Sequence, residues 1–171
     1  KMPTFSIGAA PQYPNADEGW GIPTLSPSNG DPALSWHIID ELVAREFDLT
    51  TCQEMLVDHA VALPLKLLWP NDDVCPVRIV PVCINTVQHP LPTAARCFKL
   101  GQAIGRAVES WDSDARVVVI GTGGLSHQLD GQRAGFVNKK FDLMFMEKLI
   151  SDPLWVTRYS IMDLVEITGT Q

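Results

Sequence analysis

Apolar residues recur at helical spacing from residue 32 onward. Asp31 suits the N-cap and Pro32 the first position of a helix whose inner face carries two i, i+4 rows. The rows consist of Leu34, Ile38 and Leu42, and of Ile39, Val43 and Phe47. The same spacing predicts helices over about 93–111 and about 138–150, and another that begins near Pro153.

Two apolar runs rich in β-branched residues have the continuous character of buried strands. They cover residues 77–84 and 116–120, and the second run ends abruptly at Gly121-Thr122-Gly123-Gly124. Residues 1–32 are rich in Pro, Gly, Asn and Ser, which indicates extended, irregular chain. Helices that alternate with such strands predict an α/β fold with a mixed, largely parallel central sheet flanked by helices.

Length and composition fit one globular domain over residues 1–171. Of these residues 46% are hydrophobic and 19% are charged, and no linker or internal repeat divides them. The net charge of −7 argues against nucleic acid as a partner, and no apolar run is long enough to predict a membrane span. The cysteines lack disulfide-like or zinc-like spacing, so we expect reduced thiols in a cytoplasmic protein at Cys52, Cys75, Cys83 and Cys97.

The segment over residues 117–142 carries the clearest candidate chemistry. A predicted buried strand ends in glycines, and His127 follows a few residues later. In open α/β sheets, ligands bind beyond the carboxyl ends of the strands. Gly121, Gly123 and Gly124 allow a sharp turn, and a neutral imidazole there can accept a proton and return it. The pattern alone leaves open whether His127 is functional or only caps the loop.

The same loop permits two other classes of site. The Gly-Thr-Gly-Gly run could cradle a phosphate, although it lacks the lysine of a P-loop. Ser126 resembles the serine of a nucleophile elbow, although Gln128 replaces the final glycine of that motif. A serine hydrolase is therefore an alternative, and it predicts labelling of Ser126 by a fluorophosphonate.

Asp58-His59 is the second candidate site. The aspartate is suited to orient the loop or to tune the basicity of the imidazole, although adjacent side chains need not face each other. The simpler interpretation is an ordinary helix or loop terminus. Of the other histidines, His37 is interpreted as a packing residue and His89, which precedes Pro90, as a turn residue.

Several motifs together point to a family. The run GTGGLSHQ at 121–128, followed by Arg133-Ala134-Gly135 and residues 138–142, resembles the class III extradiol dioxygenases. Within them the chain is most similar to the catalytic beta subunits of protocatechuate 4,5-dioxygenases and to gallate and methylgallate dioxygenases. Further segments follow the family's order over nearly the whole chain: ADEGWG at 16–21, EFDLT at 46–50, VDH at 57–59 and KLISDP at 148–153.

The resemblance implies cleavage of a catechol-type aromatic acid by O2 at ferrous iron held by two histidines and a carboxylate. The histidine that matches His127 is the acid-base catalyst, and the one that matches His59 lies near substrate and oxygen. The residues that would support the site are Asp58, Gly123, Gly124 and Ser126, and those that would hold the following turn and helix are Arg133, Asn138 and Asp142. The family also implies a cytoplasmic, oligomeric enzyme of aromatic catabolism, with a small helical alpha subunit that is separate or fused.

The family's iron ligands are expected outside this chain. The S-H-x-P and N-D-H motifs that carry its two histidine ligands have no counterpart here, because Asn71-Asp72-Asp73 lacks the histidine. The G-x-E carboxylate belongs just beyond the segment that matches residues 168–171. A triad rebuilt from His59 and His127 with Asp58 or Glu166 would conflict with the other roles that the family gives these histidines.

A chain that starts at Lys1 without these motifs is expected to be an internal portion of a longer enzyme. Such a portion would be inactive alone, and it would expose apolar surface and an unpaired sheet edge. A noncatalytic family member that serves as a binding or partner subunit is the alternative. The choice among protocatechuate, gallate and 3-O-methylgallate is expected to depend on residues downstream of Gln171.

Overall fold

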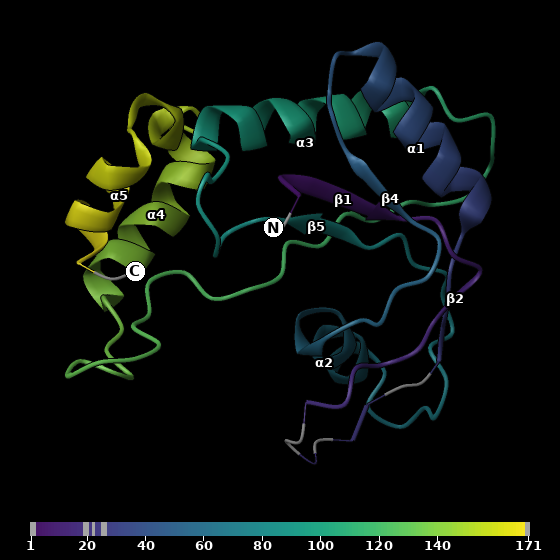
Figure 1. Ribbon diagram of the computed structural model, residues 1–171, viewed down its shortest axis with the longest axis horizontal. Coiled ribbons are helices and arrows are strands. Elements are labelled where there is room, and N and C mark those ends of the chain that lie inside the picture. The colour runs from purple at the N-terminus through teal and green to yellow at the C-terminus, as the bar shows by residue number, and fades with distance from the viewer. Residues whose placement is uncertain (1–2, 19–20, 22, 25–26, 170–171) are drawn as a thin grey trace. The chain divides into compact units, whose positions relative to one another are not determined.

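The structure is a computed structural model that describes residues 3–18, 21, 23–24 and 27–169. Gly19 and Trp20 of the 16–21 motif lie outside the described residues, as do Thr170 and Gln171. The described chain has a mixed α/β structure, as predicted, and divides into two compact units (Figure 1). The first unit comprises Lys1–Gln88 and Gln102–Thr122, and the second comprises His89–Gly101 and Gly123–Gln171.

The first unit contains a three-stranded mixed sheet in the order β4-β1-β5. The central strand β1 (Phe5–Gly8) runs parallel to β4 (Thr50–Cys52) and antiparallel to β5 (Val82–Ile84). All four residues of β1 are buried, as expected for a strand that is covered on both faces. A separate two-stranded ladder joins β2 (Gln12–Tyr13) to β3 (Ser28–Asn29).

Two helices, α1 (Pro32–Ala44) and α2 (His59–Leu68), belong entirely to the first unit, and α3 (Ala94–Glu109) crosses the unit boundary. The Asp31 carboxylate caps α1 by accepting the Leu34 N–H at 3.0 Å, as the sequence predicts. His37, on the same helix, bonds through Nε2 to the Ala107 carbonyl oxygen at 2.8 Å. This bond ties α1 to α3 and agrees with the interpretation of His37 as a packing residue.

The second unit contains α4 (Lys139–Ser151), the 3-10 helix η1 (Trp155–Arg158) and α5 (Ile161–Thr168). A row of ring contacts joins Phe141 to Phe145 at 5.8 Å, Phe145 to Trp155 at 6.3 Å, and Trp155 to Tyr159 at 5.0 Å between centroids. Such aromatic pairs add stability beyond the burial of their area. They hold η1 against α4, where the break after Pro153 would otherwise leave the chain unsupported.

The strand predictions were only partly right. Of residues 77–84 only β5 is a strand, while Ile79 forms an isolated bridge with Gly30. Residues 116–120 form no strand, and the side chains of Val118, Val119 and Ile120 are 69%, 76% and 51% exposed. A run of β-branched residues signals a buried strand only if another strand offers it hydrogen bonds, and no strand of the described residues pairs with this run.

Residues 1–32 were predicted to be irregular, which was wrong for β1, β2 and β3. The four-residue run of β1 is too short to stand out between prolines and glycines, yet it occupies the centre of the sheet. The helix α2 was also missed, since Pro64 lies inside it. The predicted helices over 93–111 and 138–150 are present as α3 and α4.

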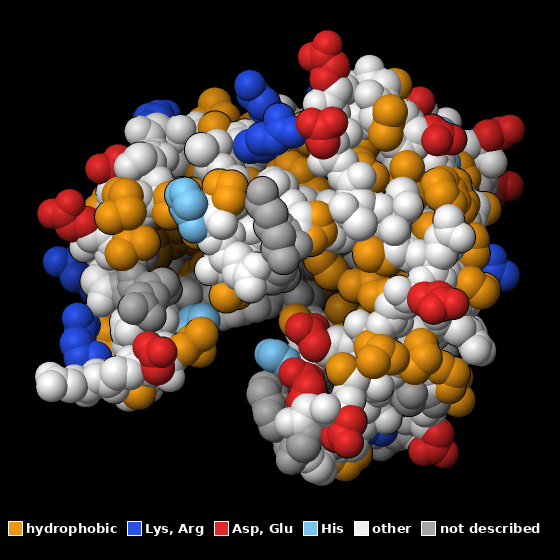
Figure 2. Space-filling view, viewed as in Figure 1, with side chains coloured by type: hydrophobic (Ala, Val, Ile, Leu, Met, Phe, Trp, Pro, Cys, Tyr) orange, Lys and Arg blue, Asp and Glu red, His pale blue; other side chains and the backbone are white. Residues whose placement is uncertain are grey.

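Large apolar side chains are prominent on the surface, where they are coloured orange in Figure 2. Examples are Leu67 on α2, Ile150 on α4 and Met162 on α5. All four cysteines are free thiols, with Cys75 buried and the others half-buried. None of the helices in the described part of the chain is long and apolar enough to cross a membrane.

The core of the first unit closes around the ring of Tyr13, which is fully buried. The Tyr13 hydroxyl accepts the Ala10 N–H at 3.1 Å, and burial raises the pKa of the hydroxyl. Two glycines make room for the ring. A Cβ at Gly8 would lie 2.7 Å from the Tyr13 hydroxyl oxygen, and one at Gly30 would overlap the Ala10 carbonyl oxygen and lie 2.8 Å from Tyr13 Cε2.

Replacing Gly30 by Ala should therefore lower the free energy of unfolding by about 1–3 kcal/mol, the usual cost of overpacking a core. Gly105→Ala is the matched control, because a Cβ at this position on α3 meets nothing within 4 Å. That change should leave stability equal or raise it by about 0.5–1 kcal/mol, since alanine is the better helix former. Urea denaturation followed by circular dichroism measures both, and equal stability of the two variants would contradict this packing.

Candidate functional site

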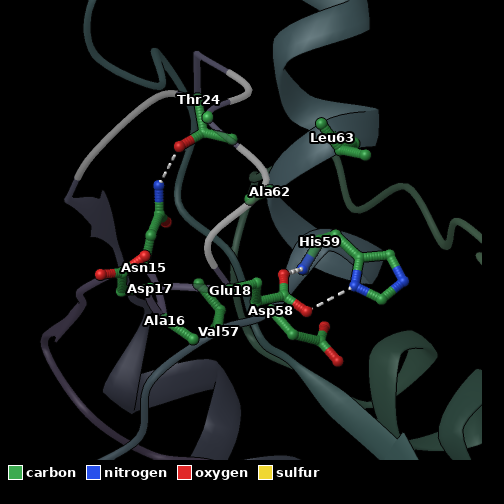
Figure 3. Close-up of a pocket in the computed structure, with 11 residues that line it drawn as sticks. Asn15, Ala16, Asp17, Glu18, Thr24, Val57, Asp58, His59, Ala62 and Leu63 are labelled. Carbon is green, nitrogen blue, oxygen red and sulfur yellow. Dashed lines mark hydrogen bonds and ion pairs between the residues drawn. The ribbon is translucent and has the colours of Figure 1, made fainter.

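A pocket of about 170 Å³ lies in the first unit, between residues 15–18, 21 and 24 on one side and the start of α2 on the other (Figure 3). Its polar lining includes the side chains of Asp17, Glu18, Asp58 and His59. Its apolar lining includes Val57, Ala62 and Leu63. The predicted candidate pair Asp58-His59 thus lines a pocket.

A short parallel bridge brings the two walls of this pocket together. Asn15 pairs with Val57, because the Val57 N–H donates to the Pro14 carbonyl oxygen at 2.9 Å and the Ala16 N–H donates to the Val57 carbonyl oxygen at 2.8 Å. Val57 is buried against Ala10 and Tyr13. The bridge sets residues 16–18 beside residues 57–59, although they are some forty positions apart in the sequence.

Glu18 bonds to His59 at two points (Figure 3). One carboxylate oxygen lies 2.7 Å from the His59 main-chain nitrogen, and the other lies 2.8 Å from His59 Nδ1. The hydrogen bond from the imidazole is the main cause that holds the pKa of Glu18 below its ordinary value. Glu18 therefore remains an ionised acceptor at neutral pH.

Asp58 has a different task from the one suggested by its place beside His59. Its carboxylate accepts the Ala60 N–H at 3.1 Å and so forms the N-cap of α2. The carboxylate that bonds to the His59 ring belongs instead to Glu18, which sequence reasoning missed as a site residue. The motif ADEGWG at 16–21 contained the signal, since Glu18 is one of the residues that carry the family resemblance.

His127 lies in the second unit on a loop that is anchored on both sides. The Ser126 N–H donates to Asp142 Oδ1 at 3.0 Å. The Gln128 N–H donates to the Phe136 carbonyl oxygen at 3.0 Å, and the Gln128 carbonyl oxygen accepts the Gly135 N–H at 2.9 Å. Because its neighbours on both sides are held by hydrogen bonds, His127 has a restricted main chain.

The ring of His127 has a defined partner at one nitrogen. Nδ1 lies 3.3 Å from the Leu125 carbonyl oxygen, which can only accept a hydrogen bond. Nδ1 therefore carries the hydrogen in the neutral ring, and Nε2 carries the lone pair. This tautomer suits a group that takes up a proton at Nε2.

The glycines before His127 differ in what they do. Gly123 has a φ of 117°, in the range that disfavours residues with a side chain, so the turn at this position requires glycine. A Cβ at Gly124 would lie 3.4 Å from His127 Nδ1, in ordinary van der Waals contact. The loop over 121–124 is exposed, whereas Ser126, two residues after it, is buried.

Ser126 is built into the support of this loop. Its side chain is buried, with 4% of the residue exposed, and its hydroxyl oxygen accepts the Asn138 N–H at 2.8 Å. Asn138 in turn caps α4 and donates from Nδ2 to the Thr168 carbonyl oxygen at 2.9 Å. A nucleophilic serine must reach its substrate, so burial and this hydrogen bond favour a structural role over the hydrolase alternative.

The residues that the structure describes do not form the iron site that the resemblance implies. Among the described residues, no three His, Cys, Asp or Glu side chains are grouped so that they could hold a metal ion. Two candidate ligands of the pocket, Glu18 and His59, already bond to each other, and the Asp58 carboxylate accepts the main-chain N–H of Ala60.

Comparison with known proteins gives a match over the full chain. The family model described as the catalytic LigB subunit of aromatic ring-opening dioxygenase matches residues 1–171. A gallate dioxygenase of Pseudomonas putida is 41% identical over 156 residues, which cover 91% of this chain and 46% of that protein. A 2,3-dihydroxyphenylpropionate/2,3-dihydroxicinnamic acid 1,2-dioxygenase of Rhodococcus jostii is 37% identical over 126 residues, which cover 74% and 38%. The chain thus spans less than half the length of these relatives.

Replacing Ser126 by Ala should lower the free energy of unfolding by about 1–3 kcal/mol, because the Asn138 N–H loses its acceptor in a partly buried place. Ser151→Ala is the matched control. Ser151 is exposed, its hydroxyl bonds only within α4, and its loss should change stability by less than about 0.5 kcal/mol. Thermal and urea unfolding compare the two, and a Ser126 variant as stable as the Ser151 variant would remove Ser126 from the support of the loop.

Proposed function

Because the chain belongs to the family of catalytic LigB subunits of aromatic ring-opening dioxygenases, we propose that it serves the cleavage of a catechol-type aromatic acid by O2. The observation that carries the proposal is His127, held on a doubly anchored loop with Nδ1 3.3 Å from the Leu125 carbonyl oxygen. Likeness to a gallate dioxygenase favours gallate or a close relative such as protocatechuate or 3-O-methylgallate.

His127 is the acid-base residue of this proposal. With the Nδ1 hydrogen directed to the Leu125 carbonyl oxygen, Nε2 takes a proton from a substrate hydroxyl, and the O–H bonding pair stays on that oxygen. The imidazolium then returns the proton to an oxygen of the opening ring. A histidine suits both directions, because its ordinary pKa lies near neutral pH.

His59 binds the substrate through a hydroxyl rather than through the carboxylate. Its surroundings are acidic, since Asp17, Glu18 and Asp58 line the same pocket. These carboxylates would repel the anionic group of an aromatic acid, whereas a phenolic hydroxyl can donate to the imidazole. The carboxylate of the substrate is therefore bound elsewhere.

The resemblance implies ferrous iron, which supplies the binding of O2 and of the catechol oxygens. We propose that its ligands come from outside the described residues, so that these residues bind the substrate and move protons but do not turn over alone. Both units are parts of one catalytic domain. The enzyme to which this domain belongs is cytoplasmic and oligomeric. It either pairs with a separate small helical alpha subunit or carries that subunit fused. Gly123, Gly124, Ser126 and Asp58 support the two histidines.

In the full-length protein, His127→Ala should lower turnover of gallate by about 100- to 10,000-fold, the contribution expected of a general acid-base group. Iron content and gallate affinity should remain, because the change removes a proton carrier and no ligand. Leu129→Ala is the control, since Leu129 is exposed on the same loop. Oxygen uptake and calorimetric titration separate the outcomes. Near-wild-type turnover would dismiss His127 as the acid-base group, and loss of iron would make it a ligand.

A further inference from the structure

We infer that Glu18 is the positioning residue of His59: it accepts the Nδ1 hydrogen of the ring and thereby directs the lone pair of Nε2 to a hydroxyl of the substrate. The inference rests on the proposed function for the identity of the substrate. The orientation of the ring rests only on the geometry of the pocket. The carboxylate that bonds to the ring of His59 is that of Glu18, and not that of the adjacent Asp58.

The two contacts of Glu18 act as a clamp rather than as a single hydrogen bond. One carboxylate oxygen accepts the main-chain N–H of His59 at 2.7 Å, and the other accepts from the ring at 2.8 Å. Main chain and ring of one residue are thus fixed by one planar group, which limits rotation of the His59 side chain. A carboxylate can only accept, so the ring hydrogen must lie on Nδ1 when the imidazole is neutral.

The main chain that precedes Glu18 is also held in place. Three residues before it, Asn15 is paired with Val57, which immediately precedes Asp58 and His59. Glu18 also meets the first N–H of α2, where the positive end of the helix dipole stabilises a negative charge. The lowered pKa of Glu18 agrees with a carboxylate that stays ionised in this place.

Asp58 cannot replace Glu18 in this task. Its carboxylate accepts the Ala60 N–H, which is one residue further along α2 than the His59 N–H, and so forms the N-cap of the helix. Loss of Glu18 would therefore leave α2 capped while the ring of His59 loses its partner at Nδ1. A change of Glu18 should alter the orientation of the ring much more than the stability of the helix.

The test compares Glu18→Ala, Glu18→Gln and the control Glu54→Ala, which removes an exposed carboxylate elsewhere in the same unit. The tautomer of His59 is read in the iron-free, full-length protein with 15N-labelled histidine, at about pH 8.5, where imidazole is neutral. The His59 signals are assigned by their loss in His59→Phe. The wild type and Glu54→Ala should hold the hydrogen on Nδ1. Glu18→Gln should move it toward Nε2, because the single carbonyl oxygen of glutamine is taken by the main-chain N–H of His59 and the amide nitrogen, a donor, then faces Nδ1. Glu18→Ala should show a mixture of both tautomers.

Steady-state kinetics of the iron-loaded, full-length variants supply the second readout. Glu18→Ala should lower kcat/KM for gallate by about 10- to 100-fold, the usual cost of removing the partner that orients a functional histidine. Glu18→Gln should recover little of this loss, because an amide that donates to Nδ1 leaves the hydrogen, and no lone pair, on Nε2. An Ala variant with the wild-type tautomer and wild-type kcat/KM would overturn the inference while leaving the proposed function in place. A wild type that opens no ring, with the tautomer still dependent on Glu18, would overturn the proposed function and leave the positioning role in place.

Discussion

The parallel bridge between Asn15 and Val57 is the constraint on which the pocket depends. Its two main-chain hydrogen bonds, at 2.9 Å and 2.8 Å, join an irregular N-terminal segment to the residues that begin α2. Val57 is buried against the ring of Tyr13. The packing of the core therefore sets the position of the hydrogen-bonded pair Glu18 and His59, because each of these residues follows the bridge within three positions.

The second unit holds its histidine in a different way. The N-terminus of α4 supplies the anchors, since the Asp142 carboxylate accepts the Ser126 N–H and the Asn138 N–H donates to the Ser126 hydroxyl. In both units, Nδ1 of a histidine lies within hydrogen-bond distance of an oxygen that can only accept. The partner is a carboxylate for His59 and a carbonyl for His127.

Sequence reasoning found the parts of this arrangement that are local. The helix cap at Asp31, the helices around residues 94–109 and 139–151, and the glycine turn before His127 each depend on neighbours in the chain. It failed where the structure of a segment depends on pairing with another segment that is distant in the sequence. The run at 116–120 has the composition of a strand but pairs with no strand of the described residues, and β1 has little signal of its own but is central because β4 and β5 flank it.

Glu18 shows the same limit at the level of the site. Nothing in the spacing of Glu18 and His59 relates them, since their contact depends on a bridge that only the folded chain reveals. Asp58 was the natural candidate because it is adjacent in sequence, yet a residue that precedes a helix is drawn to cap it. The family resemblance nevertheless contained both histidines and Glu18 within its motifs.

The most direct test of the account is oxygen uptake by the full-length, iron-loaded protein when gallate is added, followed together with the ultraviolet absorbance of the ring. One molecule of O2 should be taken up for each gallate consumed, the aromatic absorbance should be lost, and no hydrogen peroxide should be released. A protein that binds both iron and gallate but leaves the ring intact, with protocatechuate and 3-O-methylgallate equally unreactive, would contradict it.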